Sequence, residues 1–252
     1  MFSKIKIIHI DKTRSTQDTV IDYLQNDYFP SLLLVAKIQT GGRGRKDDDW
    51  HSPLGGFWAT LGISTSIFLE NSQLALFHYF TALLITRVIK EEYNLTVQIK
   101  WPNDILFSNK KLGGILIDYI TGSQKNYLLI GMGVNLNNSS SEMPENLKSI
   151  TVSIKDILGK SIPLEDFARK ICFYTDQYFT PVVKNNLEKI KRLIQEYNQY
   201  SRIYRRKVLL DDSKKYLCKG INRKGLMQFE GSEKNLNLTI DDLTRVKKII
   251  SD

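Results

Sequence analysis

The hydrophobic residues of the chain gather in short runs separated by polar turns, and the length and make-up of each run indicate a strand or a helix. Ile5–Ile10 is a β-rich run that ends at Asp11, and Leu32–Ala36 is an unbroken apolar run short enough to be a buried strand. Phe57–Ile63 has the same character. The pattern therefore predicts three strands before residue 64.

Apolar residues spaced three and four apart predict the longer helices. Gln73–Tyr93 places one set of apolar residues on a single side: Leu76, Phe80, Leu83, Leu84 and Val88. Ser161–Phe179 follows, with Ser161 as N-cap and Pro163 in the first turn, and Pro181–Tyr200 is predicted as a third helix. We expect the first of these helices to belong to the core.

Glycines interrupt the strands that follow the first long helix. Ile105–Phe107, the turn-prone Ser108–Lys110 and Lys111–Asp118 predict a hairpin, and Leu128–Asn137 is predicted as another strand. Glycine weakens a strand unless something must approach its backbone closely. We therefore expect a ligand against the strand that contains Gly113–Gly114.

From Arg202 onward the chain changes to short predicted strands at close spacing: 207–210, 216–221, 226–229 and 239–246. Such a series of short strands suggests a small β-barrel. We therefore expect two domains, residues 1–200 and residues 201–252.

The composition is that of an ordinary globular protein with an excess of basic residues. The chain has 252 residues, 42% of them hydrophobic, which is ample for a core. Its net charge of +9, from 36 basic and 27 acidic residues, suits nucleotides, nucleic acid or an acidic protein surface as partners. Cys172 and Cys218 are far apart and suggest neither a metal pair nor a disulfide, so we expect a reducing cytoplasm. The sequence has no signal-peptide core and no apolar run near about twenty residues, so we expect no membrane partner.

The stretch Gln39–Trp58 joins two predicted strands and carries the clearest sign of chemistry. Three glycines in four positions let its backbone approach a ligand closely: Gly41, Gly42 and Gly44. Arg43 and Arg45 offer guanidinium groups suited to carboxylate or phosphate, and Trp50 can fold over whatever they hold. Alone, a Gly-Arg-Gly-Arg sequence is more often a solvated surface turn.

A second polar cluster follows the predicted strand at Val97–Ile99. Proline ends the strand there and places a base, an amide and a carboxylate in one turn: Lys100, Asn103 and Asp104. A surface turn with an incidental salt bridge explains Pro-Asn-Asp alone. Lys111, at the start of the glycine-containing strand, is by itself an exposed hairpin lysine.

Together these motifs resemble those of biotin protein ligases, the enzymes that activate biotin with ATP and attach it to a carrier lysine. The Gly-Arg-Gly-Arg loop, Lys-Trp-Pro-Asn-Asp at 100–104, Lys-Leu-Gly-Gly-Ile-Leu at 111–116 and Gly-x-Gly-x-Asn at 131–135 all match. The resemblance covers essentially the whole chain. It implies an α+β fold, in which a mixed β-sheet catalytic domain of the biotin/lipoate ligase type precedes a small SH3-like β-barrel. No helix-turn-helix domain precedes Ile5, so we expect the monofunctional type, which has no DNA partner.

The resemblance also implies roles for individual residues. The biotin side would comprise Ser15, Thr16, Gln39, Gly42, Arg43, Lys111, Gly114 and Gly131. The ATP side would comprise Arg45, Trp50, Lys100, Asn103 and Asn135. The catalytic residues would be Lys111, Arg43, Arg45 and Asp104. The sequence departs from the family pattern at Gln17, where relatives have Asn, and at Asp47–Asp49, where relatives often place another arginine.

The reaction that the resemblance implies has two steps. Biotin and MgATP would give biotinyl-5'-AMP and pyrophosphate, and a specific lysine of a biotin carboxyl carrier protein domain, part of a biotin-dependent carboxylase, would then take the biotinyl group. Positive groups would have to converge where the biotin carboxylate meets the α-phosphate, and we expect Arg43, Arg45 and Lys111 to supply them. Asp104 is the candidate ligand for Mg²⁺. The enzyme would be a monomer or a homodimer.

Two other functions remain open from the sequence. Lipoate-protein ligases share the general fold and chemistry, although their usual Arg-Arg-x-x-Gly-Gly loop is absent from this sequence. A basic nucleic-acid-binding module without catalysis would use the same net charge, but it would need basic and aromatic residues spread over one face. Here the basic residues of the motifs coincide with glycine turns instead.

Overall fold

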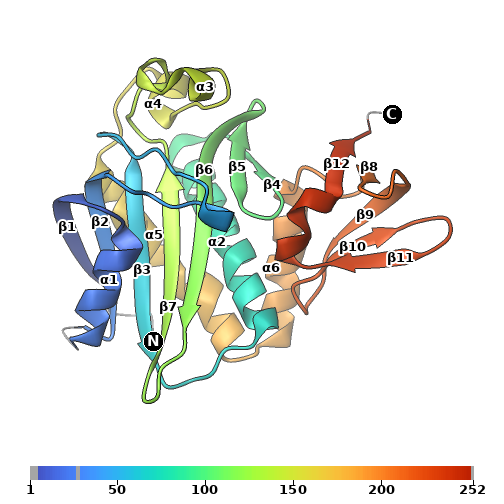
Figure 1. Ribbon diagram of the computed structural model, residues 1–252, viewed down its shortest axis with the longest axis horizontal. Helices are drawn as coiled ribbons and strands as arrows, with labels where there is room; N and C mark the ends of the chain where they lie inside the picture. The colour runs from blue at the N-terminus through green and yellow to red at the C-terminus, as the bar shows by residue number, and fades with distance from the viewer. Residues whose placement is uncertain (1–4, 27–28, 251–252) are drawn as a thin grey trace.

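A seven-stranded mixed sheet forms the larger part of the computed structural model, which describes residues 5–26 and 29–250 (Figure 1). In spatial order its strands are β1 (Lys6–Thr13), β2 (Ser31–Gln39), β3 (Phe57–Thr65), β7 (Asn126–Val134), β6 (Lys110–Ile120), β5 (Asp104–Phe107) and β4 (Gln98–Lys100). β1 and β2 are parallel, and the other neighbouring strands are antiparallel. The predicted mixed sheet is therefore confirmed.

Helices cover both faces of this sheet. α1 (Thr16–Gln25) crosses from β1 to β2 on one face, and α2 (Asn71–Tyr93), α5 (Leu164–Val183) and α6 (Leu187–Tyr200) lie behind the other (Figure 1). β2 is buried on both sides, because Leu33 and Val35 join the main core while Leu32 and Leu34 pack under α1. Strands that are covered on both faces read as continuous apolar runs, which is why this strand could be predicted from the sequence.

The long helix α2 is the central helix of the core. Its length and hydropathy would allow it to cross a membrane, but most of it is buried inside the protein. All of the residues predicted to face the core are buried: Leu76, Phe80, Leu83, Leu84 and Val88. The opposite side is buried too, since α5 and α6 pack against it. The helix is therefore a core element, as predicted.

The predicted break between the last two long helices is wrong. α5 continues through Pro181 to Val183, and its N-cap is Pro163 rather than Ser161. Proline near a helix C-terminus removes only one backbone hydrogen bond, while Phe179 and Val182 on the same turn are buried in the core. Two short helices, α3 (Glu145–Lys148) and α4 (Ile154–Leu158), were not predicted.

A five-stranded antiparallel sheet forms the C-terminal unit, so the predicted small β unit is confirmed. Its strands are β8 (Lys207–Leu210), β9 (Lys215–Ile221), β10 (Met227–Glu230), β11 (Asn235–Leu238) and β12 (Val246–Ile249). The strand predicted for residues 239–246 is wrong, because Ile240–Arg245 is a 3-10 helix. The backbone N–H and the hydroxyl of Thr239 both donate to the Asp242 carboxylate, at 2.8 and 2.9 Å, and this local turn competes with an extended strand.

The C-terminal unit lies beside the β4 end of the large sheet (Figure 1). Arg202 N–H donates to the carbonyl of Ile99 in the turn of chain that leads into the unit, at 2.8 Å. The Tyr79 hydroxyl of α2 donates to the Gly225 carbonyl at 3.1 Å, between β9 and β10. These contacts bring residues from the end of the chain close to the glycine-arginine loop.

Candidate active site

A cavity of about 480 Å³ lies between the sheet, α1 and the glycine-arginine loop. It brings together most of the predicted site residues: Ser15, Thr16, Gln39, Arg43, Arg45, Trp50, Lys100, Asn103, Asp104, Lys111, Gly114 and Gly131. These residues come from segments more than a hundred positions apart in the sequence. The sequence motifs therefore form one site.

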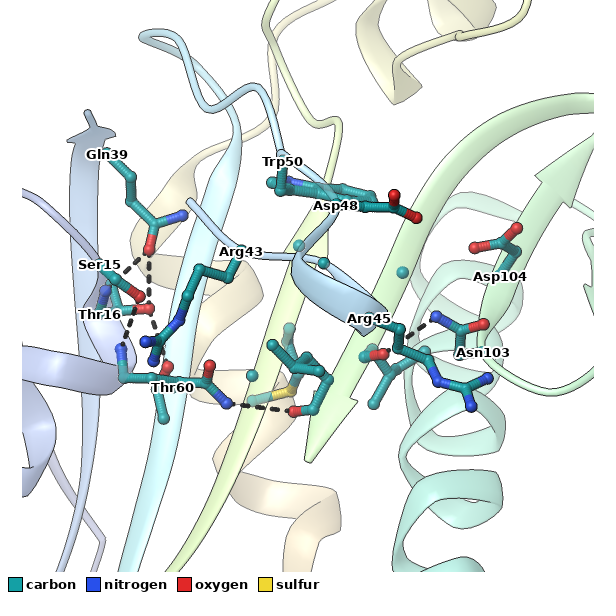
Figure 2. Close-up of a pocket in the computed structure, with 18 of the residues that line it drawn as sticks. Ser15, Thr16, Gln39, Arg43, Arg45, Asp48, Trp50, Thr60, Asn103 and Asp104 are labelled. Atoms are coloured by element: carbon teal, nitrogen blue, oxygen red, sulfur yellow. Dashed lines mark hydrogen bonds between the residues drawn. The ribbon is translucent and has the colours of Figure 1, made fainter. Parts of the chain in front are cut away.

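One end of the cavity is a network of neutral hydrogen-bonding groups (Figure 2). The backbone N–H and the hydroxyl of Thr16 both donate to Gln39 Oε1, at 2.8 and 3.0 Å. The same hydroxyl lies 2.8 Å from the Thr60 hydroxyl, and Gln39 Nε2 donates to Ser52 Oγ at 2.9 Å. Ser15 caps α1, since its side chain accepts from Gln17 N–H. We call Ser15, Thr16, Gln39 and Thr60 the neutral end of the cavity.

Gln17, which stands where relatives have Asn, also faces this end. Its side chain is buried, and its Nε2 lies 3.5 Å from the Leu116 carbonyl. A Cβ added at Gly131 would lie 3.3 Å from that Nε2 and 3.1 Å from the same carbonyl. The amide of Gln17 therefore packs over Gly131, so this substitution keeps a neutral polar group in place.

The other end of the cavity is charged. Lys111 Nζ lies 2.8 Å from Asp104 Oδ1, and Lys100 Nζ lies 3.6 Å from Asp104 Oδ2. Asn103 Nδ2 donates to the Ile115 carbonyl at 3.2 Å, which fixes the turn that carries these groups. Asp104 is mostly buried, so one carboxylate orients two lysines. We call Lys100, Asn103, Asp104 and Lys111 the charged end.

Trp50 covers the floor of the cavity. Gly114 and Gly133 are paired across β6 and β7, and a Cβ added at either would lie 2.9 or 2.7 Å from the indole. Figure 2 shows the indole over the strands of the sheet, and Lys111 Nζ lies 4.8 Å from its ring centroid. The close approach that we predicted for a ligand at Gly114 is thus made by Trp50. Small residues at both positions are needed to admit a large flat ring.

The two arginines of the loop diverge (Figure 2). Arg43 Nη2 lies 2.8 Å from Asp18 Oδ1, whereas Arg45 Nη2 donates to the Ile240 carbonyl at 2.5 Å and lies 3.3 Å from Asp241. The predicted convergence of the two arginines with Lys111 is therefore not present in this ligand-free arrangement. A desolvated guanidinium needs acceptors, and each arginine takes those within its own reach.

Two predicted residues lie outside the cavity wall. Gly42 closes the base of the loop: its carbonyl accepts from Trp50 N–H at 2.9 Å, and a Cβ there would lie 2.5 Å from the Trp50 carbonyl. Asn135 Nδ2 donates to the Lys111 carbonyl at 3.3 Å, and its Oδ1 accepts from Asn138 at 3.0 Å. Both residues shape the site from behind, and their contacts with biotin or adenine stay predictions.

Sequence reasoning missed Thr60, although a signal was present. Thr60 is the one hydroxyl within the apolar run Phe57–Ile63, and it pairs in register with Gly131. A buried hydroxyl in an apolar strand needs a partner, so its presence indicates a polar site. Asp18 and Asp118, which face Arg43, were also missed.

The residues at the charged end do not form a resident metal site. Across 5–26 and 29–250, no group of three His, Cys, Asp or Glu side chains is placed to hold a metal ion. Asp104, the candidate Mg²⁺ ligand, is already paired with Lys100 and Lys111. A Mg²⁺ ion would therefore have to arrive with phosphate oxygens that provide most of its coordination.

Comparison with known proteins identifies relatives of the whole chain. The model of the biotin/lipoate A/B protein ligase family matches residues 10–135. The bifunctional ligase/repressor BirA of Bacillus subtilis is 31% identical over 194 residues, which are 76% of this chain and 59% of that protein. The human biotin-protein ligase is 32% identical over 142 residues, or 54% of this chain and 20% of that protein. This chain thus spans less than two thirds of either relative's length.

Solved structures show the same fold. The biotin protein ligase of Aquifex aeolicus, in complex with biotin and ATP, superimposes with a TM-score of 0.74 at 24% identity and covers 92% of this chain and 95% of that one. The Leishmania major biotin protein ligase in complex with biotin has a TM-score of 0.63 at 23% identity, covering 93% of this chain. The likeness includes the C-terminal unit.

Proposed function

The chain belongs to the biotin/lipoate A/B protein ligase family, and we propose that it is an ATP-dependent biotin protein ligase. It would convert biotin and ATP into biotinyl-5'-AMP and pyrophosphate, and then transfer the biotinyl group to a specific lysine of a biotin carboxyl carrier protein domain. The observation that carries this proposal is the polarity of the cavity, which is neutral and hydrogen-bonding at one end and charged at the other.

The neutral end suits the ureido ring of biotin. A ureido group is uncharged and offers two N–H donors and one carbonyl acceptor, and the neutral end presents hydroxyl and amide groups from Ser15, Thr16, Gln39 and Thr60. A site built to hydrogen-bond its ligand strongly rejects an analogue that lacks those groups. The dithiolane ring of lipoate has neither donor nor strong acceptor, so the same network disfavours lipoate.

The charged end suits the phosphates of ATP. Lys100 and Lys111 stand there with Asp104 between them, and Trp50 presents an aromatic face close by. Adenine stacks favourably on such a face. Biotin and ATP would therefore lie end to end, with the biotin carboxylate meeting the α-phosphate between the two ends.

The first step joins two groups that repel one another. A carboxylate oxygen of biotin attacks the α-phosphorus, and the bond from that phosphorus to the bridging oxygen breaks as pyrophosphate leaves. Lys111 is positioned by Asp104 to offset the negative charge at this point, and Arg43 supplies a second cation from the loop. Mg²⁺ belongs to this step as part of the substrate MgATP, where it shields the leaving phosphates.

In the second step, the amine of the carrier lysine attacks the acyl carbon of the adenylate. An amide bond forms, AMP leaves with the former bridging oxygen, and the amine gives up a proton to solvent. Trp50 and the loop would cover the mixed anhydride until a carrier arrives, which limits its hydrolysis. The cysteines are free thiols, which supports a site of action in the reducing cytoplasm.

Pyrophosphate release tests this proposal. The protein is incubated with MgATP and either biotin or lipoate, and pyrophosphate and acyl-adenylate are measured in a single turnover. We expect both products with biotin and a rate at least about a hundredfold lower with lipoate. Comparable rates would show that the neutral end does not select for the ureido ring, and no product with either acid would refute the ligase assignment.

A further inference from the structure

Two carboxylates that take no direct part in the proposed reaction face the guanidinium of Arg43. Asp18 comes from the first turn of α1, and Asp118 comes from β6, across the cavity. Arg43 Nη2 lies 2.8 Å from Asp18 Oδ1 and 3.9 Å from Asp118 Oδ2. The guanidinium of a loop residue is thus held between two elements that are themselves fixed by the fold.

The surroundings make this cluster more than a chance surface pair. Asp118 is half-buried, and burial raises its pKa; the nearby charge of Asp18 acts in the same direction, while Arg43 opposes both. Two carboxylates brought together in this way repel each other unless a cation stands between them. The pair therefore favours a conformation of the loop in which Arg43 remains at this place.

Arg43 needs such support because its own chain segment provides little. It lies between Gly42 and Gly44, and its side chain is 44% exposed. A free arginine side chain has about 2 kcal/mol of rotamer entropy to lose when it is fixed. An ion pair through Nη2 removes part of that freedom and leaves other N–H groups of the planar fork for a ligand.

We propose that Asp18 and Asp118 are positioning residues for the adenylation reaction, holding the Arg43 guanidinium beside the junction of biotin carboxylate and α-phosphate. This inference rests on the proposed function. The carboxylates do not touch the reacting atoms; they act through Arg43. A rival reading of the same contacts is that the carboxylates compete with the substrate for Arg43, and the two readings differ in the sign of the effect of removing a carboxylate.

The test uses isosteric substitutions in the full chain. Asp18→Asn and Asp118→Asn remove the charge and keep the shape, and Asp22→Asn is the matched control, since Asp22 lies one turn further along α1 and is exposed. We expect each of the first two to lower kcat/KM for biotin-dependent pyrophosphate release by about tenfold, the scale typical of residues that orient a ligand-binding group. Asp22→Asn should stay within about twofold.

A double-mutant cycle with Arg43→Ala separates positioning from a structural role. If the carboxylates act through Arg43, Asp118→Asn should have no further effect on kcat/KM in the Arg43→Ala background. A full tenfold loss in that background, or a gain in activity from either Asn variant in the wild-type background, would overturn the proposal. Melting temperatures of all variants show whether a loss follows unfolding instead; a tenfold loss that is accompanied by unfolding at the assay temperature also counts against it. Failure of the wild-type protein to form adenylate would refute the ligase function itself, which is a separate result.

Discussion

Gly133→Ala tests whether the ring of Trp50 must lie flat on the sheet for ATP to bind. The added methyl carbon would lie 2.7 Å from Cε2 and Nε1 of Trp50, whereas carbon atoms in contact stand about 3.5 Å apart, so the ring must retreat by roughly 0.8 Å. The backbone cannot yield instead, because Gly133 pairs with Trp58 on one side and with Gly114 on the other.

The displaced ring should weaken ATP binding in two ways. It moves relative to Lys111, whose Nζ now lies 4.8 Å from its centroid, and a cation-π contact contributes about 0.5–1 kcal/mol at such a site. It also moves toward the space where adenine would stack, and overpacking of this kind costs about 1 kcal/mol or more. A total near 1.5–2 kcal/mol corresponds to a rise of about tenfold or slightly more in the KM for ATP.

The assay is steady-state pyrophosphate release with each substrate varied in turn. Gly131→Ala is the matched control on the same strand, because a Cβ there meets the Leu116 carbonyl and Gln17 rather than Trp50. We expect Gly133→Ala to raise the KM for ATP and Gly131→Ala to raise the KM for biotin. An unchanged KM for ATP in Gly133→Ala would refute the role of Trp50 in nucleotide binding, and a lower KM would show that the ring blocks the nucleotide site.

Three further results are expected. Lys111→Ala should slow adenylate formation by about a hundredfold or more, because it removes one preorganised charge; a rate near wild type would mean that Lys111 is only a hairpin lysine. Ser15→Ala should lower the free energy of unfolding in urea by about 1 kcal/mol through loss of the α1 cap. Burial lowers the pKa of His78 to about 3 from the usual 6.5, so only the unfolded chain gains a proton there as the pH falls. The free energy of unfolding should drop by about 2 kcal/mol between pH 6.5 and pH 5, and His78→Phe should remove this part of the pH dependence.

The sequence predicted those parts of the molecule that depend on local pattern. The apolar run of β2 and the buried stripe of α2 have the lengths and spacings of their elements, so they could be read without tertiary information. The motif residues also proved to line one cavity. Each of these predictions rested on neighbouring residues in the chain or on a pattern shared with a family.

Features that depend on distant contacts could not be read in the same way. The Arg45 guanidinium meets the Ile240 carbonyl, 195 residues away, and nothing in either segment indicates the other. Trp50 was expected to cover a ligand, yet it fills the floor above Gly114 and Gly133 itself. Pro181 was taken as a helix start because proline favours that position, but core packing on both sides of it extended the helix.

The most direct test of the proposed activity is intact-mass spectrometry of a biotin carboxyl carrier domain after incubation with the protein, biotin and MgATP. We predict one biotinyl group on one lysine of the domain, none when ATP is omitted, and no comparable acylation when lipoate replaces biotin. A carrier domain that stays unmodified with biotin, or that is acylated equally well by lipoate, would contradict the assignment of the neutral end to the ureido ring and of the charged end to ATP.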